Sequence, residues 1–262
     1  MIDVNKPYKR IFVFGCSFAQ WRYPTWADVL VKSLNPDIEY YNFALAGGGN
    51  TFISTRLSQA NRKFKFNKDD LVAVMWSTFC REDHWAHSRW ITPGNIFTQN
   101  EIDDKFVKKF SEPVGYMMRD LTIIETTTKL IDTLPCDTLN ILSVPFDYQM
   151  DLSEYKNIGK EVYQLYQDLE DSFPESLFHL QMNGIWGQHI KYYSSWSPDK
   201  PGVDYHPTTV DYMNYLLKLG INLTDDSKRY AEDTLNLILK NVTYEKDFQK
   251  LFPDLVISDQ LW

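Results

Sequence analysis

Three short segments contain the residue types that nucleophilic catalysis requires. Ser17 follows a buried-strand pattern at residues 9–15 and is predicted to open a helical turn, where free backbone N–H groups favour developing negative charge. Asp204 and His206 lie two positions apart, so in an extended segment both side chains point the same way. A histidine can take the proton of a serine hydroxyl while an aspartate orients its ring. The alternative is that Ser17 and Asp204 are helix caps and His206 faces solvent.

A turn of three consecutive glycines, Gly47-Gly48-Gly49, follows a second strand pattern at residues 38–43. Glycines can present backbone N–H groups to a ligand without a side chain in the way. An oxyanion site, a phosphate loop and a plain flexible turn are the three interpretations. The phosphate loop is disfavoured because no Lys-Ser/Thr pair follows the glycines and no G-x-G-x-x-G fingerprint is present.

The order of the elements predicts how these segments meet. Strand patterns occur at residues 9–15, 38–43, 70–77 and 138–144, and helical patterns at 24–34, 52–62, 114–134, 159–169, 207–219 and 227–241. This alternation is typical of a three-layer α/β/α sandwich with a central, mostly parallel sheet, whose ligands bind beyond the carboxyl ends of the strands. We expect one domain over residues 1–262. A long irregular insert at about 81–113 would form a lid or pocket wall, with a short strand at 177–180 and closing helices after 207.

The three segments together resemble motifs of the SGNH (GDSL-like) hydrolase superfamily, of which this chain would be a divergent member. Gly15-Cys16-Ser17-Phe18 is similar to the G-D-S-[LF] element, with Cys16 in place of the aspartate. Residues 42–47 are similar to the N-x-G-x-x-G element, with Ala44 in place of the first glycine. Residues 204–207 resemble the D-x-x-H-P element, shortened by one position. The likeness spans residues 9–220 and depends on the order of the motifs.

The resemblance implies a role for each matching residue. Ser17 would be the nucleophile and would donate its own N–H to the oxyanion, with a second N–H from Gly47. His206 would accept the Ser17 proton, and Asp204 would orient His206. The family's G-x-N-D element is missing, since its asparagine position falls on Phe79, which cannot donate a hydrogen bond.

Four residues are candidates to replace the missing side-chain donor. Asn50 and Thr78 rank first, because both follow predicted strand ends that face the same crevice. Ser77 and Arg81 are the other two.

The resemblance implies a serine esterase that hydrolyses a carboxylic ester through an acyl-Ser17 intermediate, for instance by deacetylating a carbohydrate. Two alternatives stay open: an O-acyltransferase, and a carbohydrate- or protein-binding module that has lost efficient catalysis, which Phe79 and Cys16 favour. Some aromatic side chains would suit a small-molecule or carbohydrate ester crevice and a packed core equally well. They are Tyr23, Trp76, Trp85, Trp90, Trp186 and Trp196.

Composition excludes several other classes. The formal charge of −8 disfavours nucleic acid as a partner, and no apolar run is long enough to cross a membrane. The three scattered cysteines and the pair His84 and His87 lack metal-ligand spacing, so neither a metal nor a cofactor is expected. Without a signal-peptide pattern we expect a cytoplasmic protein, and the composition would suit a phage-encoded one. The oligomeric state is not predicted.

Overall fold

The protein is described by a computed structural model that covers residues 2–97, 102–148, 160–184, 190–194 and 197–255. Four strands of these residues form one parallel sheet in the order β2-β1-β3-β6. They are β1 (Arg10–Phe14), β2 (Glu39–Asn42), β3 (Asp70–Trp76) and β6 (Asp137–Leu142). In the register of the sheet, Arg10 lies opposite both Glu39 and Asp70.

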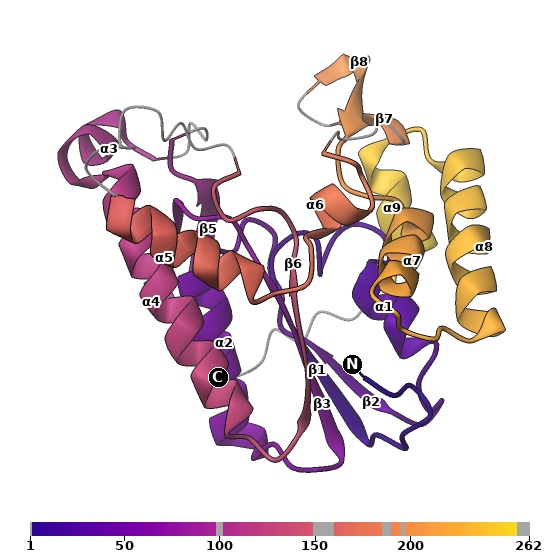
Figure 1. The fold of residues 1–262 in the computed structure, drawn as a ribbon. Helices are drawn as coiled ribbons and strands as arrows, with labels where there is room; N and C mark the ends of the chain where they lie inside the picture. The colour runs from indigo at the N-terminus through magenta and orange to yellow at the C-terminus, as the bar shows by residue number, and fades with distance from the viewer. Residues whose placement is uncertain (1, 98–101, 149–159, 185–189, 195–196, 256–262) are drawn as a thin grey trace.

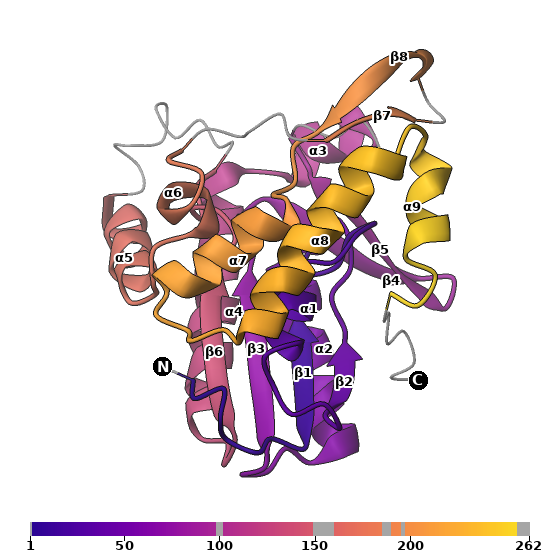
Figure 2. The ribbon, with the colours of Figure 1, turned by 90° about the vertical axis from the view of Figure 1, so that its right-hand side faces the viewer.

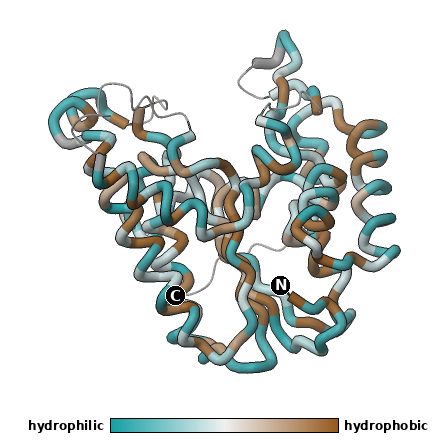
Figure 3. Tube along the Cα trace, viewed as in Figure 1, coloured by the Kyte–Doolittle hydropathy of each residue, from teal (hydrophilic) through white to brown (hydrophobic). Residues whose placement is uncertain are grey.

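Helices cover both faces of this sheet (Figures 1 and 2). On one face lie α1 (Trp26–Val31), α7 (Thr209–Lys218) and α8 (Asp225–Asn241), and on the other α2 (Asn50–Phe64), α4 (Pro113–Asp132) and α5 (Lys160–Asp171). Every residue of β3 is buried, with alternate side chains in the two cores, as expected for a central parallel strand. Figure 3 shows hydrophobic stretches along the strands between the helical layers. The predicted three-layer α/β class is confirmed.

Two antiparallel hairpins stand at the same end of the molecule (Figure 1). One joins β4 (Arg81–Ala86) to β5 (Arg89–Asn95), and the other joins β7 (Ile190–Ser194) to β8 (Ser197–Asp204). The first hairpin and α3 (Asp104–Phe110) replace the irregular region predicted at 81–113. The turn at His87 and Ser88 has two left-handed residues, for which glycine and asparagine are the usual signal, so the sequence did not reveal it.

The strand predicted at 177–180 is wrong. These residues form α6 (Leu177–Leu180), because the Ser176 hydroxyl accepts a hydrogen bond from the N–H of His179 at 3.3 Å and caps the helix. The last helix, α9 (Glu245–Leu251), packs through Phe248 into a small third core with Tyr23 and Tyr192. None of the described helices is both long and apolar enough to span a membrane.

Candidate active site

Ser17 lies in a tight turn directly after β1. The N–H groups of Ala19 and Gln20 both donate to the Cys16 carbonyl, at 2.9 and 3.1 Å, which closes a single turn. The expected turn is thus present at Ser17, but it does not continue as a helix, since α1 begins only at Trp26. The Ser17 N–H donates to none of the described residues.

Two side chains fasten this turn in place. The Asn42 amide donates to the Ala19 carbonyl at 2.9 Å, and the Thr25 hydroxyl donates to the same oxygen at 3.1 Å. A Cβ at Gly15 would stand 2.7 Å from the Ala19 Cβ, so only glycine lets the turn approach β1 this closely. The Asn42 and Gly15 positions of the two motifs therefore hold the Ser17 loop.

Asp204 and His206 form a hydrogen-bonded pair at the end of β8. The buried Asp204 carboxylate lies 2.9 Å from His206 Nδ1 and also accepts the His206 backbone N–H at 2.9 Å. Thr208, with Asp211 in a capping box, caps α7, so the alternative in which Asp204 caps that helix is wrong. The Tyr23 hydroxyl donates to the His206 carbonyl at 3.2 Å, which further fixes this loop.

Trp21 positions both members of this pair, a role that the sequence analysis missed. Its indole N–H donates to Asp204 Oδ2 at 2.8 Å, and its ring stacks on the His206 imidazole with centroids 3.7 Å apart. Burial by itself would raise the pKa of Asp204, but the hydrogen bonds from His206 and Trp21 lower it below the usual range. Asp204 is thus an ionised acceptor. The only signal in the sequence is that Trp21 closely follows Ser17.

The Ser17 turn and the His206 loop lie against each other. The Phe18 ring centroid is 5.2 Å from that of His206, and Trp21 leaves the same turn. Among the described residues no hydrogen bond joins the Ser17 hydroxyl to His206. The structure therefore brings Asp204 and His206 together and places His206 beside the immediate neighbours of Ser17.

Of the three consecutive glycines, only Gly47 keeps its N–H unused within the described part of the chain. The N–H of Gly48 donates to the Leu45 carbonyl at 3.0 Å, and the N–H of Gly49 donates to Asp83 at 2.9 Å. Since the Leu45 N–H donates to the Gly15 carbonyl, the loop with Gly47 runs beside the Ser17 loop. This leaves Gly47 as the glycine able to donate to an oxyanion.

The β4–β5 hairpin occupies the other side of the glycine turn. Its Asp83 carboxylate accepts the N–H groups of Gly49 and Phe52, each at 2.9 Å, and so caps α2. An anion of the protein itself already fills the place that a phosphate would need, which contradicts the phosphate-loop alternative. A Cβ at Gly47, where φ is +78°, would lie 2.1 Å from the Thr92 carbonyl oxygen. The hairpin therefore packs closely against the glycine turn.

Asn50 and Thr78 do not have the free donors that their expected role requires. The Asn50 amide donates to the Ser77 carbonyl at 3.0 Å and to Asp120 at 3.1 Å, and it accepts the Ser77 N–H at 3.0 Å. The Thr78 hydroxyl donates to the carbonyls of Phe146 and Tyr148, at 2.8 and 3.0 Å. Both residues hold the loop after β3, in place of the oxyanion role expected from the sequence.

Phe79, Arg81 and Ser77, which lie in or next to this loop, differ in their contacts. The Phe79 ring is buried and stacks on Phe146, so it does not enter the site. Arg81 donates to the Gly48 carbonyl at 3.1 Å and ties the hairpin to the glycine turn. Ser77 is the exception, because its buried hydroxyl has no hydrogen-bond partner among the described residues. Ser77 follows Met75 on the face of the sheet against which the Ser17 turn packs.

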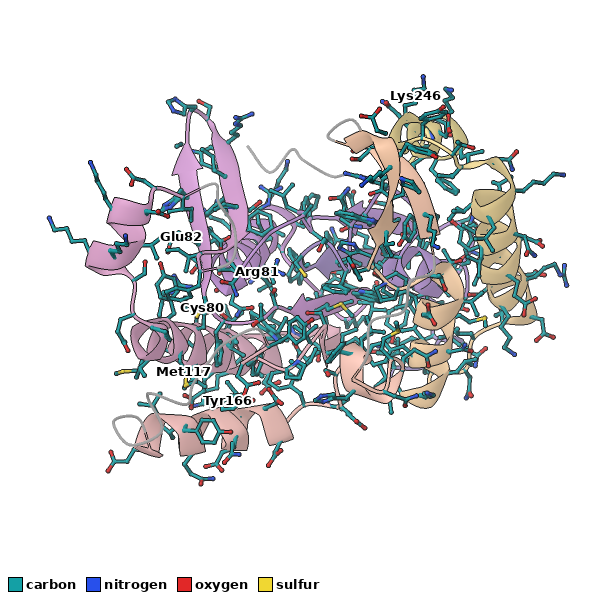
Figure 4. All side chains as sticks on the ribbon, turned by 90° about the horizontal axis from the view of Figure 1, so that it is seen from above. Cys80, Arg81, Glu82, Met117, Tyr166 and Lys246 are labelled. Carbon is teal, nitrogen blue, oxygen red and sulfur yellow. The ribbon has the colours of Figure 1, made fainter. Side chains whose placement is uncertain are left out.

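The aromatic residues expected around a crevice are dispersed. Tyr23 and Trp76 are buried in the core, whereas Trp85 on the hairpin is 54% exposed. Trp90 packs edge-on against Phe52 at 5.3 Å, and Trp186 and Trp196 lie outside the described residues. Seen from above in Figure 4, Arg81 and Glu82 lie between the β4–β5 hairpin and α4, well away from Lys246 of α9 at the upper right. In the part of the chain that the structure describes, no three His, Cys, Asp or Glu side chains form a metal site.

Neither a protein-family model nor a curated protein matches this sequence. Among solved structures, it is similar to a lipolytic protein of the G-D-S-L family from Veillonella parvula, with 11% identity, 80% of this chain and 94% of that chain covered, and a TM-score of 0.41. It is also similar to a GDSL-like lipase from Bacteroides thetaiotaomicron, with 14% identity, 81% and 87% covered, and a TM-score of 0.40. The chain is thus similar to GDSL proteins, at a distance that leaves its chemistry to be argued from its own side chains.

Proposed function

We propose that this chain is a serine esterase that cleaves a carboxylic ester, for instance an acetyl ester, through an acyl-Ser17 intermediate. The observation that supports the proposal most is the pair formed by the buried Asp204 and the partly buried His206, packed against the Ser17 turn. A histidine held at Nδ1 by an ionised aspartate keeps Nε2 free to accept a proton. Because Thr208 caps α7 instead, Asp204 is free for that task.

In the proposed mechanism His206 Nε2 removes the Ser17 hydroxyl proton as Oγ attacks the ester carbonyl carbon. The carbonyl π electrons move to oxygen, and the N–H groups of Ser17 and Gly47 bind the oxyanion. Collapse breaks the ester C–O bond, and His206 returns the proton to the departing alcohol. Water then attacks the acyl-enzyme with His206 again as base, which releases the acid and regenerates Ser17. The Ser17–His206 hydrogen bond is expected to form with substrate, as such bonds are often long in ligand-free enzymes.

Ser77 is our candidate for the side-chain oxyanion donor. Asn50 and Thr78 have their donors engaged, whereas the Ser77 hydroxyl has none of the hydrogen bonds that a buried polar group normally forms. An unpaired hydroxyl can donate to an oxyanion without first breaking another hydrogen bond.

Labelling with a fluorophosphonate tests this function directly. Ser17 Oγ would attack phosphorus and expel fluoride, so we expect stoichiometric labelling of the intact protein and none of Ser17→Ala or His206→Ala. Ser172→Ala, an exposed serine, is the control and should label fully. Folded protein that does not label would refute the esterase and favour the alternative of a binding module. If the serine labels, an acceptor alcohol is added to the aqueous ester assay. The ratio of new ester to free acid then separates acyl transfer from hydrolysis.

A further inference from the structure

A pocket of about 440 Å³ lies beside the proposed catalytic centre, between the loops after β1 and β2 and helix α9. Trp21 and Ala46 form its inner side, and both are immediate neighbours of the site: Trp21 stacks on His206, and Ala46 precedes Gly47. Its outer side belongs to α9, which begins next to Lys246 in Figure 4. The volume is within the range of roughly 300–1,000 Å³ that small-molecule sites occupy.

The walls of this pocket are held in place by their own contacts. Arg22 forms an ion pair with Glu245 at 2.7 Å and donates to the Tyr192 hydroxyl. Its guanidinium lies 5.1 Å from the Trp21 ring. Behind the wall, Phe248 packs on Tyr192, with centroids 5.2 Å apart. The pocket is therefore formed before a ligand arrives, which lowers the entropic cost of binding.

The lining combines aromatic surface with neutral hydrogen-bonding groups. Phe248 and Phe252 line it together with the amides of Gln20 and Gln249. Within the described residues neither amide side chain has a hydrogen-bond partner. Two unpaired amides each offer donors and an acceptor, which suits hydroxyl groups. A purely aliphatic acyl chain would displace the water bound to these amides and would offer them no hydrogen bonds in its place.

The charges of the pocket argue against an ionic ligand. Arg22 is the cation of the lining and Glu245 the anion, and they neutralise each other at 2.7 Å. A phosphate or carboxylate would have to compete with Glu245 for the guanidinium, and an ammonium would have to compete with Arg22. Arg22 can still donate a hydrogen bond to a neutral hydroxyl, and Glu245 can still accept one from it.

We propose that this pocket binds a neutral, polyhydroxylated alcohol part of the ester, such as a sugar ring. The inference rests on the proposed esterase function only in assigning the bound group to the substrate. The pocket itself is argued from Trp21, Arg22, Gln20, Gln249 and the residues of α9.

Ligand-observed saturation-transfer NMR on the full-length Ser17→Ala protein tests the pocket without turnover. The probes are the methyl glycosides of glucose, galactose, xylose and N-acetylglucosamine, with methyl hexanoate as the apolar probe and methyl phosphate as the anionic probe. We expect transfer to at least one glycoside and to neither of the other two probes. Gln249→Leu, at an exposed position, should weaken glycoside binding about three- to tenfold, the effect of losing one neutral hydrogen bond. Gln167→Leu, an exposed glutamine of α5, is the matched control and should bind normally.

The outcomes separate this proposal from the esterase itself. Fluorophosphonate labelling of Ser17 with no transfer to any glycoside overturns the pocket assignment and leaves the esterase standing. Transfer to methyl hexanoate alone also overturns it, since the pocket would then accept the acyl chain. Glycoside binding that Gln249→Leu weakens, in a protein that does not label, supports the pocket and refutes the esterase.

Discussion

The two sides of the carboxyl edge of the sheet use polar residues in opposite ways. Beside β1, the N–H of Ser17 has no described hydrogen-bond partner, and Asp204 is tied to His206, whose second ring nitrogen stays available. Beside β3, Asn50 is bound to Asp120 and to the Ser77 backbone, and Asp120 also accepts from Arg119. The two regions contain similar kinds of polar residue, at similar positions near the ends of the strands. The difference between the two regions lies in which hydrogen bonds have been left unmade.

The two aspartates show the same contrast in their pKa values. Hydrogen bonds from His206 and Trp21 outweigh burial at Asp204 and keep its pKa below the ordinary value. At Asp120 burial dominates and raises the pKa to about 6, despite the Arg119 guanidinium at 2.7 Å. One carboxylate is therefore arranged to carry charge, and the other resists it.

The largest expected effect belongs to Asp204→Asn. The amide would lose the charge that holds the His206 ring, and in serine hydrolases such a change costs on the order of a thousandfold or more in turnover. Ester hydrolysis and the rate of fluorophosphonate labelling should fall together. Asp199→Asn, an exposed aspartate of the same strand, should change neither. Equal activity of the two variants would show that the pair beside β1 is as structural as the one beside β3.

Asn50→Ala should reveal the opposite behaviour in the region beside β3. It would remove the bonds to Ser77 and Asp120 and leave their buried partners unpaired, a loss of about 2–4 kcal/mol in the free energy of unfolding. Urea denaturation measures that loss, with exposed Asn241→Ala as the control. The folded fraction of Asn50→Ala should still label at Ser17. A stable variant with no labelling would instead give Asn50 the oxyanion role.

Ser77→Ala tests an unpaired hydroxyl beside β3, which departs from this contrast. We expect about a hundredfold lower turnover, typical of losing one oxyanion donor, with no loss of stability because the hydroxyl has no described partner to lose. Ser143→Ala is the matched control. Its buried hydroxyl donates to the Trp76 carbonyl at 2.9 Å, so this variant should lose stability and keep its activity. Unchanged turnover in Ser77→Ala would leave the oxyanion to backbone donors alone.

The smallest expected effect is that of Asp120→Asn on how the free energy of unfolding changes with pH. Because the folded-state pKa of Asp120 is about 6 and the unfolded value about 4, its ionisation costs stability as pH rises through this window. Asparagine removes that cost, so its stability relative to the original protein should be about 2–3 kcal/mol better at pH 8 than at pH 4. Paired urea titrations at both pH values measure the difference. A difference that does not change with pH would mean that Asp120 is ionised as easily as a surface aspartate.

The sequence was most informative where a short segment determines its own geometry. The continuous apolar runs predicted the parallel strands, because a strand covered on both faces has no solvent side. The spacing of Asp204 and His206 predicted their contact, which the structure shows at 2.9 Å. The roles proposed for these residues in catalysis stay predictions.

The sequence was least informative where a residue is defined by a distant partner. Asn50 follows a glycine turn and looks available, but its bond to Asp120 spans 70 positions of sequence. Trp21 gains its role only because β8 brings Asp204 beside it, 183 positions later. Phe79 occupies the position of the family's asparagine in the sequence, but its ring lies in the core beside Phe146. Contacts of this kind depend on the folded chain and have no local pattern.

The cap on α2 has a consequence for how the chain is made. The helix takes its N-terminal acceptor from Asp83, which comes 34 positions after Gly49 and 31 after Phe52. During synthesis α2 is translated before Asp83, the residue that caps it. Its first amide groups therefore have no acceptor from Asp83 until the hairpin has been translated and has docked. A shortened chain that replaced the hairpin by a tight turn would leave α2 permanently in that unfinished state.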